Sequence, residues 1–481
     1  FCKKTNSQAF SGAIPKRAID HVHYCIDGIE HHNILLTIAI EILLFTSFLS
    51  FSHALFGDAM VGNVMAIGIP FIVGAFLFGV GHHIAAWRHP DVDPAAALRP
   101  QHYKNLARIA EAGLFDAIFS ADTMGLPGAP AEALARNVPP HQFEPLELLT
   151  ALAGVTERIG LVGTVSTTYL PPYHLARKVA TLDHLSGGRA GWNLVTSGSD
   201  HEARIFGLDQ QLSHASRYEK AREYVDVVKG LWDSFEDDAP LFDKEGGRYF
   251  DPAKLHRLDH SGKHYQVQGA LQSQRPVQGY PVMVQAGSSE DGQELAAATA
   301  ELVFTAHQSV EDARAFYSNL KGRLPAHGRA PDALKILPGV SPVVGRTQAE
   351  AQEKYERLQS LIEPSVGLGL LSGFVGGFDF SAYPLDGPVP DLPPTEGWQS
   401  RQELFLSLAR RENLTLRQLY QRAATARGHI AHERADQRGL AHAVAPEQAE
   451  RCRGRVHGVD PAQDVAVAVV GVKGFDPQHV S

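Results

Sequence analysis

Between residues 71 and 345 the chain alternates short apolar runs with amphipathic segments at helical spacing, and this alternation restricts the fold more than any other feature. The apolar runs have the length and composition of buried strands, and the segments between them have the period of a helix. Strand and helix alternate at least seven times, which predicts a parallel sheet with helical crossovers. That number of repeats favours a (β/α)₈ barrel, an α/β fold, over a doubly wound sheet.

The expected elements follow the apolar pattern directly. Strands are predicted at 71–78, 115–122, 158–167, 189–197, 281–287, 301–306 and 334–345. Helices are predicted at 146–156 and 173–185, and from about residues 290 and 310. Two further helices are marked by one-sided apolar faces, Tyr103, Leu106, Ala107, Ala110 and Leu114 in one and Tyr218, Ala221, Val225, Val228 and Trp232 in the other.

The chain divides into three parts of unequal character. We expect an atypical apolar extension at 1–70, a barrel at 71–429 and an atypical tail at 430–481. Residues 234–280 form a long insertion without a helical period, which we expect to shape a substrate pocket, since loops of this length are usually lids or binding loops. The tail offers no clear apolar strand where an eighth is needed, so the barrel is expected to close incompletely.

The N-terminal extension holds two apolar stretches within 34–78, each about long enough to span a bilayer. Lys3, Lys4, Lys16 and Arg17 precede them, as they would a signal or anchor. Against this, Glu41 in mid-span is costly in a membrane, and glycine and proline interrupt the second stretch. A membrane anchor and a segment with no working role are both open, and we expect a cytoplasmic protein.

Composition excludes several classes of function. The chain has 44 basic and 53 acidic residues and no long basic run, so a nucleic-acid partner is not expected. Its three cysteines, Cys2, Cys25 and Cys452, lie near the ends, which excludes a disulfide framework in the middle and fits a reducing compartment. The spacing of cysteine and histidine matches no structural zinc site, and no metal is predicted.

Polar and small residues gather where the predicted strands end, and the carboxyl ends of barrel strands are where active sites lie. Asp122 follows the second strand and Thr168 the third. Asn193 stands in the fourth, and His82 and His83 follow the first. Asp122 has a solvated loop aspartate as its alternative reading, and the two histidines lack a partner carboxylate at metal-ligand spacing.

The segment QAGSSEDGQELAAA gives the best physical signal for a ligand. A strand ends, Gly287 permits close approach, and Ser288 and Ser289 stand at the start of a helix. A helix N-terminus carries unpaired N–H groups and partial positive charge, which suits a phosphate. A simple N-cap by either serine explains the same residues, so both readings stand.

The segment SHASRYEKAREY gives the second signal. If the helix begins at Ser213, His214 and Tyr218 share one face. If Ser216 and Glu219 form a capping box instead, His214 precedes the helix and Tyr218 lies in its first turn. In both cases the two side chains lie near a strand-top loop, and a core tyrosine with a surface histidine is the alternative reading.

Six long motifs in this order resemble the bacterial-luciferase-like flavin monooxygenases, in the branch of the nitrilotriacetate and dibenzothiophene-sulfone monooxygenases. They are GAFLFGVGHHIAAWRHP, FDAIFSADT, VSTTYLPPYHLARKVATLDHLSGGRAGWNLVTS, ARIFG, RYEKAREYVDVVKGLWDS and PVMVQAGSSEDGQELAA. The resemblance covers about residues 74–429. It implies a (β/α)₈ barrel of the luciferase-like type.

The resemblance also implies an activity: a two-component monooxygenase that uses FMNH₂ and O₂ to oxidise a small organic substrate, containing nitrogen or sulfur and including xenobiotics. A separate NAD(P)H-dependent flavin reductase would supply the FMNH₂, and a homo-oligomer is expected. By motif, the flavin would meet Asp122, Thr168, His214, Tyr218, Ser288 and Ser289. Asn193 is a weaker carry-over, and His82 and His83 are assigned as a hypothesis to substrate or peroxide contacts; no catalytic residue is named.

Two other functions are left open by the sequence. A truncated, non-catalytic flavin-binding relic is consistent with the missing last barrel unit. A deazaflavin-dependent oxidoreductase is consistent with the barrel class, although the motifs favour FMN. Arg248, Lys254, Arg257 and Lys263 in the insertion hint at an anionic substrate.

Overall fold

The computed structural model describes residues 72–424, apart from 127–130, 137–141, 308–309, 340–342, 344, 346 and 395–398. Seven parallel strands form one sheet in the order β1-β2-β3-β4-β9-β10-β11. They are β1 (Gly74–Leu77), β2 (Ala117–Ser120), β3 (Gly160–Ser166), β4 (Ala190–Val195), β9 (Val282–Gln285), β10 (Leu302–Thr305) and β11 (Lys335–Pro338). The sheet curls into a nearly closed barrel, so the predicted fold class is confirmed.

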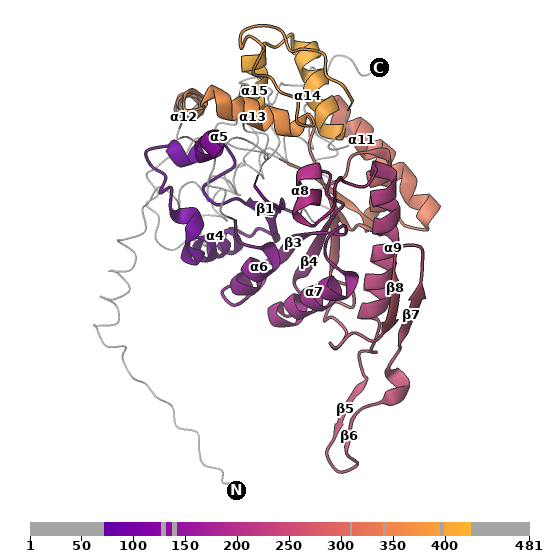
Figure 1. The fold of residues 1–481 in the computed structure, drawn as a ribbon. Coiled ribbons are helices and arrows are strands. Elements are labelled where there is room, and N and C mark those ends of the chain that lie inside the picture. The colour runs from indigo at the N-terminus through magenta and orange to yellow at the C-terminus, as the bar shows by residue number, and fades with distance from the viewer. Residues whose placement is uncertain are drawn as a thin grey trace, which may run out of the picture.

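Helices cover the outside of the sheet (Figure 1). They are α4 (Pro100–Ala112), α6 (Pro145–Ala153), α7 (Pro172–Ser186), α9 (His214–Trp232), α10 (Glu290–Thr299) and α11 (Val310–Arg323). Two short helices, α5 (Ala131–Ala135) and α8 (Asp200–Ile205), lie instead at the upper end of the barrel in Figure 1. Short 3₁₀ turns lie at Ala86–Arg88, Ala96–Leu98, Pro252–Lys254, Leu324–His327 and Pro331–Ala333. Proline at the first position of α4, α6 and α7 explains where these helices begin, because its missing N–H is not needed there.

The largest core lies between the sheet and its helices. Trp192, Tyr224 and Trp232 are among its largest fully buried side chains, and the predicted apolar face of α9 is confirmed as buried. The predicted face of α4 is right except at Leu114. The helix ends at Ala112, and Leu114 lies beyond it in a left-handed conformation (φ 62°), 68% exposed. The apolar spacing that marks the buried face of α4 continues in the sequence past the residue where the backbone turns towards β2.

A second core belongs to a lobe of four helices, α12 (Gln348–Ser360), α13 (Pro364–Phe374), α14 (Gln399–Glu412) and α15 (Leu416–Ala423). This lobe lies at the upper end of the barrel in Figure 1, near α5 and α8. Ile84 and Ala85, which follow β1, are buried in the same core, and the Ile84 amide donates to the Ala424 carbonyl at 3.1 Å. The lobe is therefore tied to the loop at the carboxyl end of β1.

The insertion at 234–280 folds into two antiparallel hairpins. The first pairs β5 (Pro240–Asp243) with β6 (Arg248–Phe250), and the second pairs β7 (Leu258–Ser261) with β8 (Gln266–Gly269). The second hairpin lies along α9, whereas the first projects from the end of the barrel opposite to the four-helix lobe (Figure 1). The β5–β6 hairpin follows the last turn of α9 and lies away from the four-helix lobe, and the role of the insertion in shaping a substrate pocket stays a prediction.

Within the described residues β1 and β11 are the outer strands of the sheet, as the expected lack of an eighth strand implied. The expected extension at 1–70 and tail at 430–481, with all three cysteines, lie outside the described residues. The apolar stretches at 34–78 fall outside them as well, except for residues 72–78. In the part of the chain that is described, no helix has the length and apolarity needed to cross a bilayer.

Candidate active site

The strands all run in one direction, so their carboxyl ends meet at one edge of the barrel and form its mouth. Residues paired between parallel strands point to the same side of the sheet. The pairs Phe76–Phe119 and Thr164–Asn193 thus share the inner side, opposite to Trp192, which packs outward against Tyr224. The barrel interior is built from these alternate residues.

Three phenylalanine rings fill the interior next to the seam between the outer strands. The Phe76 ring lies 5.0 Å from Phe119 and 5.9 Å from Phe304, both edge-on, and Phe119 stacks on Phe304 at 6.1 Å. His82 joins this cluster with its ring 4.7 Å from Phe76. Such a wall keeps water from a bound ring system and offers it apolar contact.

Asn193 supplies a polar group to the same interior. Its Nδ2 donates to the Thr164 hydroxyl at 2.8 Å, and the side chain is only 3% exposed. Its Oδ1 is buried without a hydrogen-bond partner. A buried acceptor without a hydrogen-bond partner costs free energy. An unpaired oxygen of this kind is typical of a binding site in which a ligand N–H donates to it.

At one side of the mouth the first turn of α9 meets the turn after β9. Ser213 caps α9 by accepting from the Ser216 amide, so the helix begins at His214 and the alternative start at Ser216 is wrong. The His214 ring lies 4.8 Å from that of Tyr218, and its Nδ1 lies 3.1 Å from Asp291 Oδ2 in α10. A Cβ placed on Gly287 would lie 3.1 Å from the Tyr218 hydroxyl. His214, Tyr218 and the β9–α10 turn are thus brought together, as either reading of the sequence requires.

Ser289 is the N-cap of α10. Its hydroxyl oxygen accepts from the Gly292 amide at 3.2 Å, which leaves the hydroxyl proton available to a second partner. Ser288 is exposed, and its carbonyl accepts from Gln293 Nε2. Glu290 and Asp291, the acids of this first turn, are paired with Arg323 and His214, which offsets the negative charge beside the helix N-terminus.

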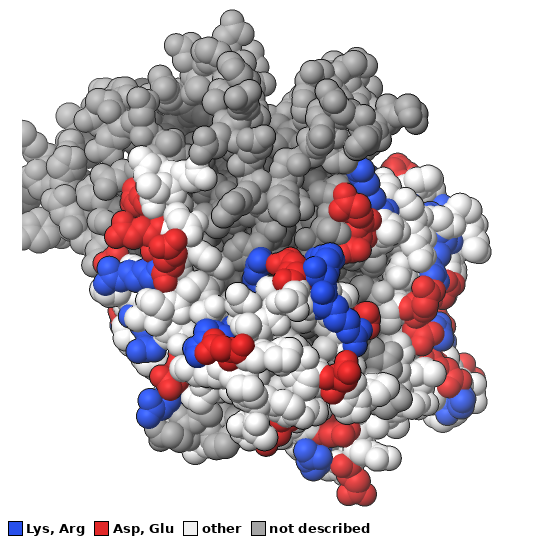
Figure 2. Space-filling view, turned by 90° about the horizontal axis from the view of Figure 1, so that it is seen from above, with Lys and Arg blue, Asp and Glu red and all other residues white. Residues whose placement is uncertain are grey.

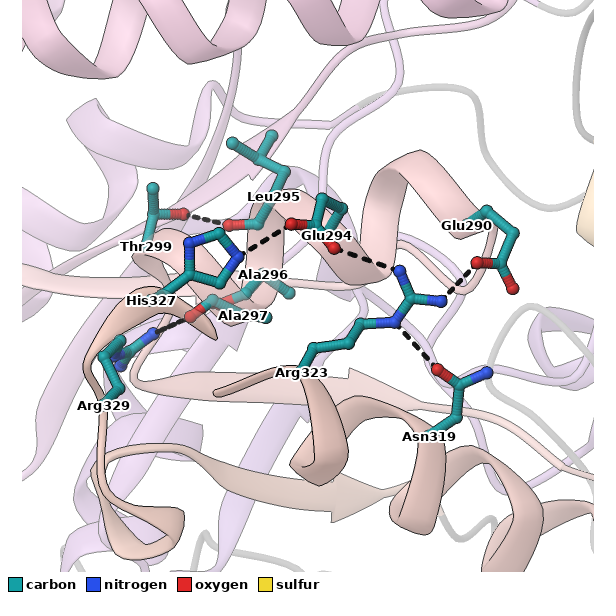
Figure 3. A network of polar contacts seen from close by, with 10 residues as sticks. All are labelled: Glu290, Glu294, Leu295, Ala296, Ala297, Thr299, Asn319, Arg323, His327 and Arg329. Atoms are coloured by element: carbon teal, nitrogen blue, oxygen red, sulfur yellow. Dashed lines mark hydrogen bonds and ion pairs between the residues drawn. The ribbon is translucent and has the colours of Figure 1, made fainter. Parts of the chain in front are cut away.

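Figure 3 shows what holds α10 in place. Arg323 of α11 donates to Asn319 and Glu294 and also contacts Glu290, and His327 lies 2.8 Å from Glu294. Although burial acts in the opposite direction, the hydrogen bonds from His327 and Arg323 lower the pKa of Glu294. At the other end of the helix Arg329 donates to the Ala297 carbonyl at 2.8 Å. These contacts fix the direction in which the N-terminus of α10 points.

The part of the mouth formed by the loops after β2 and β4 is held by a buried carboxylate. Glu202 of α8 is 7% exposed and accepts from the Met124 amide, after β2, at 3.1 Å. It also accepts from the amides of Gly198 and Ser199 and from the Ser197 hydroxyl, after β4. Burial, and secondarily the nearby Glu202 charge, raise the pKa of Asp122 to about 6 despite a hydrogen bond from the Thr123 amide. The loops after β2 and β4 are thereby joined.

Thr168 follows β3, the strand that lies between β2 and β4 in the sheet. Its hydroxyl donates to the Thr196 carbonyl at 2.6 Å, and its carbonyl accepts from Lys220 of α9 at 3.1 Å. Burial lowers the pKa of Lys220. This contact places the loop after β3 against the second turn of α9, close in sequence to Tyr218.

The two histidines after β1 point to different surroundings. His82 Nε2 lies 2.9 Å from the Phe76 carbonyl, an acceptor, so Nε2 carries the proton. His83 Nδ1 accepts from the Ala85 amide at 3.1 Å, and burial lowers the pKa of His83 to about 4. Within the described residues there is no group of three or more His, Cys, Asp or Glu that could hold a metal ion.

Sequence reasoning missed Lys220 and His307 as parts of the mouth. His307 directly follows β10, its Nε2 2.6 Å from the Thr305 hydroxyl, and burial lowers its pKa. Lys220 gave no signal, because a lysine on a charged helix face is usually solvated.

On the face seen from above, the described surface carries acidic and basic side chains in mixture rather than a patch of one sign (Figure 2). In the insertion, Lys254 and Lys263 are paired with Asp238 and Glu219. These two cations are therefore paired with acids of the same chain.

Comparison with known proteins bears on the same region of the chain. The model of the luciferase-like monooxygenase family matches residues 80–463. The chain is 47% identical over 360 residues to N-acetyl-S-(2-succino)cysteine monooxygenase of Bacillus subtilis (strain 168), covering 74% of this chain and 80% of the relative. It is 49% identical over 363 residues to nitrilotriacetate monooxygenase component A of Aminobacter aminovorans, with the same two coverages.

A solved structure agrees in fold. The crystal structure of riboflavin lyase with modified FMN and riboflavin superimposes with a TM-score of 0.65 and 31% identity, covering 74% of this chain and 79% of that one.

Proposed function

Because the chain belongs to the luciferase-like monooxygenase family, and is thus an oxidoreductase that transfers one oxygen atom of O₂ to a small organic substrate, we propose that it uses reduced FMN bound at the barrel mouth. The observation that carries this proposal is the meeting of His214, Tyr218 and the start of α10 around Gly287. The expected FMN contacts of Asp122, Thr168, Ser288 and Ser289 belong to the same proposal.

The residues at the mouth fit the phosphate and the ring of FMN separately. The N-terminus of α10, with the Ser289 hydroxyl proton and the Tyr218 hydroxyl beside it, suits a phosphate. The wall of Phe76, Phe119 and Phe304 suits a flat ring, and the unpaired Oδ1 of Asn193 can accept from a ring N–H. Lys220 and Thr168 join α9 to the loop after β3.

When bound, reduced FMN supplies the two electrons with which O₂ is split between product and water. The chain's own residues bind, orient and exclude water. His214 is held by Asp291, so its ring is fixed beside the phosphate position. The His82 Nε2 proton is donated to the Phe76 carbonyl, and we propose that His82 and His83 contact substrate or its oxidant.

A separate NAD(P)H-dependent flavin reductase is the proposed source of FMNH₂. One relative is named as component A of its enzyme, and another, from Streptomyces pristinaespiralis, is named as one of the subunits of pristinamycin IIA synthase. For the substrate we propose a small molecule with nitrogen or sulfur, because relatives of this chain are named for an S-substituted cysteine and for nitrilotriacetate.

The test is an anaerobic titration of the purified chain with FMNH₂. We expect saturable binding that weakens roughly tenfold in Tyr218→Phe and in Ser289→Ala, since each loses about one hydrogen bond to the phosphate. Tyr224→Phe is the matched control, because this buried tyrosine of the same helix has a hydroxyl without a partner. It should bind FMNH₂ as the wild type does.

Two results would overturn the proposal. A folded chain that does not bind FMNH₂ would overturn the proposal directly. If such a chain binds a reduced deazaflavin instead, the deazaflavin-dependent oxidoreductase is favoured. Binding without formation of an oxygenated product, when substrates are screened in air with a flavin reductase and NAD(P)H, would favour the non-catalytic relic. Circular dichroism separates these results from a chain that is unfolded.

A further inference from the structure

Gln293, one turn into α10, is a buried side chain with a single hydrogen bond. It is 6% exposed, and its Nε2 donates to the Ser288 carbonyl at 3.0 Å. Its Oε1 is buried and has no hydrogen-bond partner. A buried amide with an unpaired oxygen is less favourable than an apolar side chain of the same length. The part of Gln293 that the fold uses is therefore its N–H donor.

That donor fixes the direction of one peptide group. Ser288 and Ser289 are joined by a trans peptide, whose C=O and N–H lie in one plane and point in opposite directions. Gln293 holds the Ser288 carbonyl towards the buried side of the turn, so the Ser289 N–H points away from it, towards the side where Ser288 is exposed. Among the described residues this N–H has no acceptor. The turn thus keeps a free backbone donor beside the N-terminus of α10.

The turn itself packs tightly on the helix that follows it. A Cβ placed on Gly287 would lie 3.1 Å from Gly292 Cα, and one placed on Gly292 would lie 3.1 Å from Gly287 Cα. If the Ser288–Ser289 peptide rotated between these held ends, a carbonyl oxygen would take the place of the N–H. The oxygen carries partial negative charge and would repel an anion at the helix start. The hydrogen bond from Gln293 opposes this rotation.

A second buried amide lies against the same turn. Gln285, the last residue of β9, is 3% exposed, and its Oε1 is buried without a hydrogen-bond partner. A Cβ on Gly287 would lie 3.7 Å from Gln285 Nε2 and 3.1 Å from the Tyr218 hydroxyl, so this amide faces the turn. Buried polar groups are paired in most native structures. An unpaired one at this place is independent evidence that the turn binds a ligand.

We propose that Gln293 is a positioning residue for the phosphate of reduced FMN. It holds the Ser288 carbonyl away from the anion and so directs the Ser289 N–H towards it. This inference rests on the proposed FMN site and adds a residue that does not itself contact the cofactor. A hydrogen bond from an N–H to a charged phosphate oxygen is roughly twice as strong as one between neutral groups, so loss of this direction should be measurable.

The test is an anaerobic titration of the full chain with FMNH₂ and with reduced riboflavin, which has the same ring but no phosphate. Gln293→Met keeps the length of the side chain and removes the donor. We expect it to weaken FMNH₂ binding roughly tenfold and to leave the affinity for reduced riboflavin unchanged. Gln402→Met is the matched control, because this buried glutamine of α14 also donates from Nε2 to backbone carbonyls, those of Val375 and Pro393. It should leave both affinities unchanged.

Ser289 offers a second route that keeps Gln293 intact. Its φ of −68° is close to the value that proline fixes, so Ser289→Pro removes the N–H and retains this angle, whereas Ser289→Ala keeps the N–H. Both variants lose the hydroxyl. Ser289→Pro should therefore bind FMNH₂ roughly tenfold more weakly than Ser289→Ala. Adding Gln293→Met should weaken binding further in Ser289→Ala but not in Ser289→Pro, since the N–H through which Gln293 acts is already gone.

The other outcomes count against the inference. Equal losses of FMNH₂ and reduced riboflavin affinity in Gln293→Met would mean that the residue only supports the fold, and unchanged affinities would mean that it does not direct the peptide. Both results leave the FMN site standing, because the wild type still binds FMNH₂. A folded wild type that does not bind FMNH₂ would overturn the proposed function and this inference together. If Gln293→Met does not fold, equal FMNH₂ affinities of Ser289→Pro and Ser289→Ala would overturn the inference.

Discussion

The two sides of the barrel mouth are built on the same topology but present opposite chemistry. After β2 and β4 a buried carboxylate, Glu202, collects the amides of the loops, and Asp122 lies within reach of its charge. After β9 the amides are left at a helix N-terminus, with hydroxyls of Ser289 and Tyr218 beside them. A strand-to-helix turn can therefore be closed by an internal acid or left open to an external anion. We call the part of the mouth at Asp122 and Glu202 the closed side and the part at the N-terminus of α10 the open side.

This difference makes the mouth electrostatically asymmetric. An anionic group is repelled by the Asp122–Glu202 side and favoured at the α10 side. An elongated cofactor with a phosphate at one end should accordingly lie with that end at α10. Substitutions on the closed side should therefore act mainly on stability, and those on the open side mainly on binding.

The largest expected effect is on the closed side. Glu202→Ala should lower the free energy of unfolding by about 3 kcal/mol, since it strands several buried N–H and O–H donors. Urea denaturation at neutral pH measures this. Glu202→Gln keeps one acceptor oxygen and should lose less; a Glu202→Ala chain as stable as the wild type would mean that the carboxylate does not hold the loops.

On the open side Gly287→Ala should weaken FMNH₂ binding roughly tenfold, because the new Cβ would lie 3.1 Å from both the Tyr218 hydroxyl and Gly292 Cα. Gly322→Ala is the control. It lies in α11 with no atom within 4 Å of the new Cβ, and alanine there should stabilise the helix by about 0.5–1 kcal/mol. Equal affinities for the two variants would remove Gly287 from the site.

A smaller effect concerns pH. The pKa of Asp122 is raised from 3.8 to about 6, so between these values the folded state holds a proton that the unfolded state has released. Asp122 therefore contributes stability below pH 4 that is lost as the pH rises through 6. Asp122→Asn should remove this pH-dependent contribution to stability. The difference in melting temperature between pH 4.5 and pH 7 should therefore differ by roughly 3 °C between the variant and the wild type. Identical pH profiles for the two proteins would show that Asp122 titrates normally.

The smallest effect is expected at the hairpin beside α9. Lys263→Ala breaks an ion pair with Glu219 that is exposed to solvent, so stability should change by less than about 0.5 kcal/mol and FMNH₂ affinity should stay the same. Thermal melts and the same titration measure both. A large loss would show that β7–β8 depends on this pair more than on the buried bonds of Glu223.

The order of elements was readable from sequence, because strand and helix periods are local. The buried face of α9 and the strands containing Trp192 and Phe119 were predicted from spacing alone. Leu114 was misread for the same reason, since a local pattern does not show where the backbone turns. The two hairpins of the insertion at 234–280 could not be predicted from the sequence, because their pairing depends on which residues contact α9.

For the site, the sequence determined which residue types follow each strand, and with them the candidates Asp122, Thr168, His214, Tyr218, Ser288 and Ser289. Only the tertiary structure determined which groups these residues and their neighbours contact. It set His214 against Asp291, 77 positions away, and Glu202 against the Met124 amide, 78 positions away. Parallel strands bring such distant segments to one edge, and the charge, burial and pKa of each group depend on the neighbours it meets there.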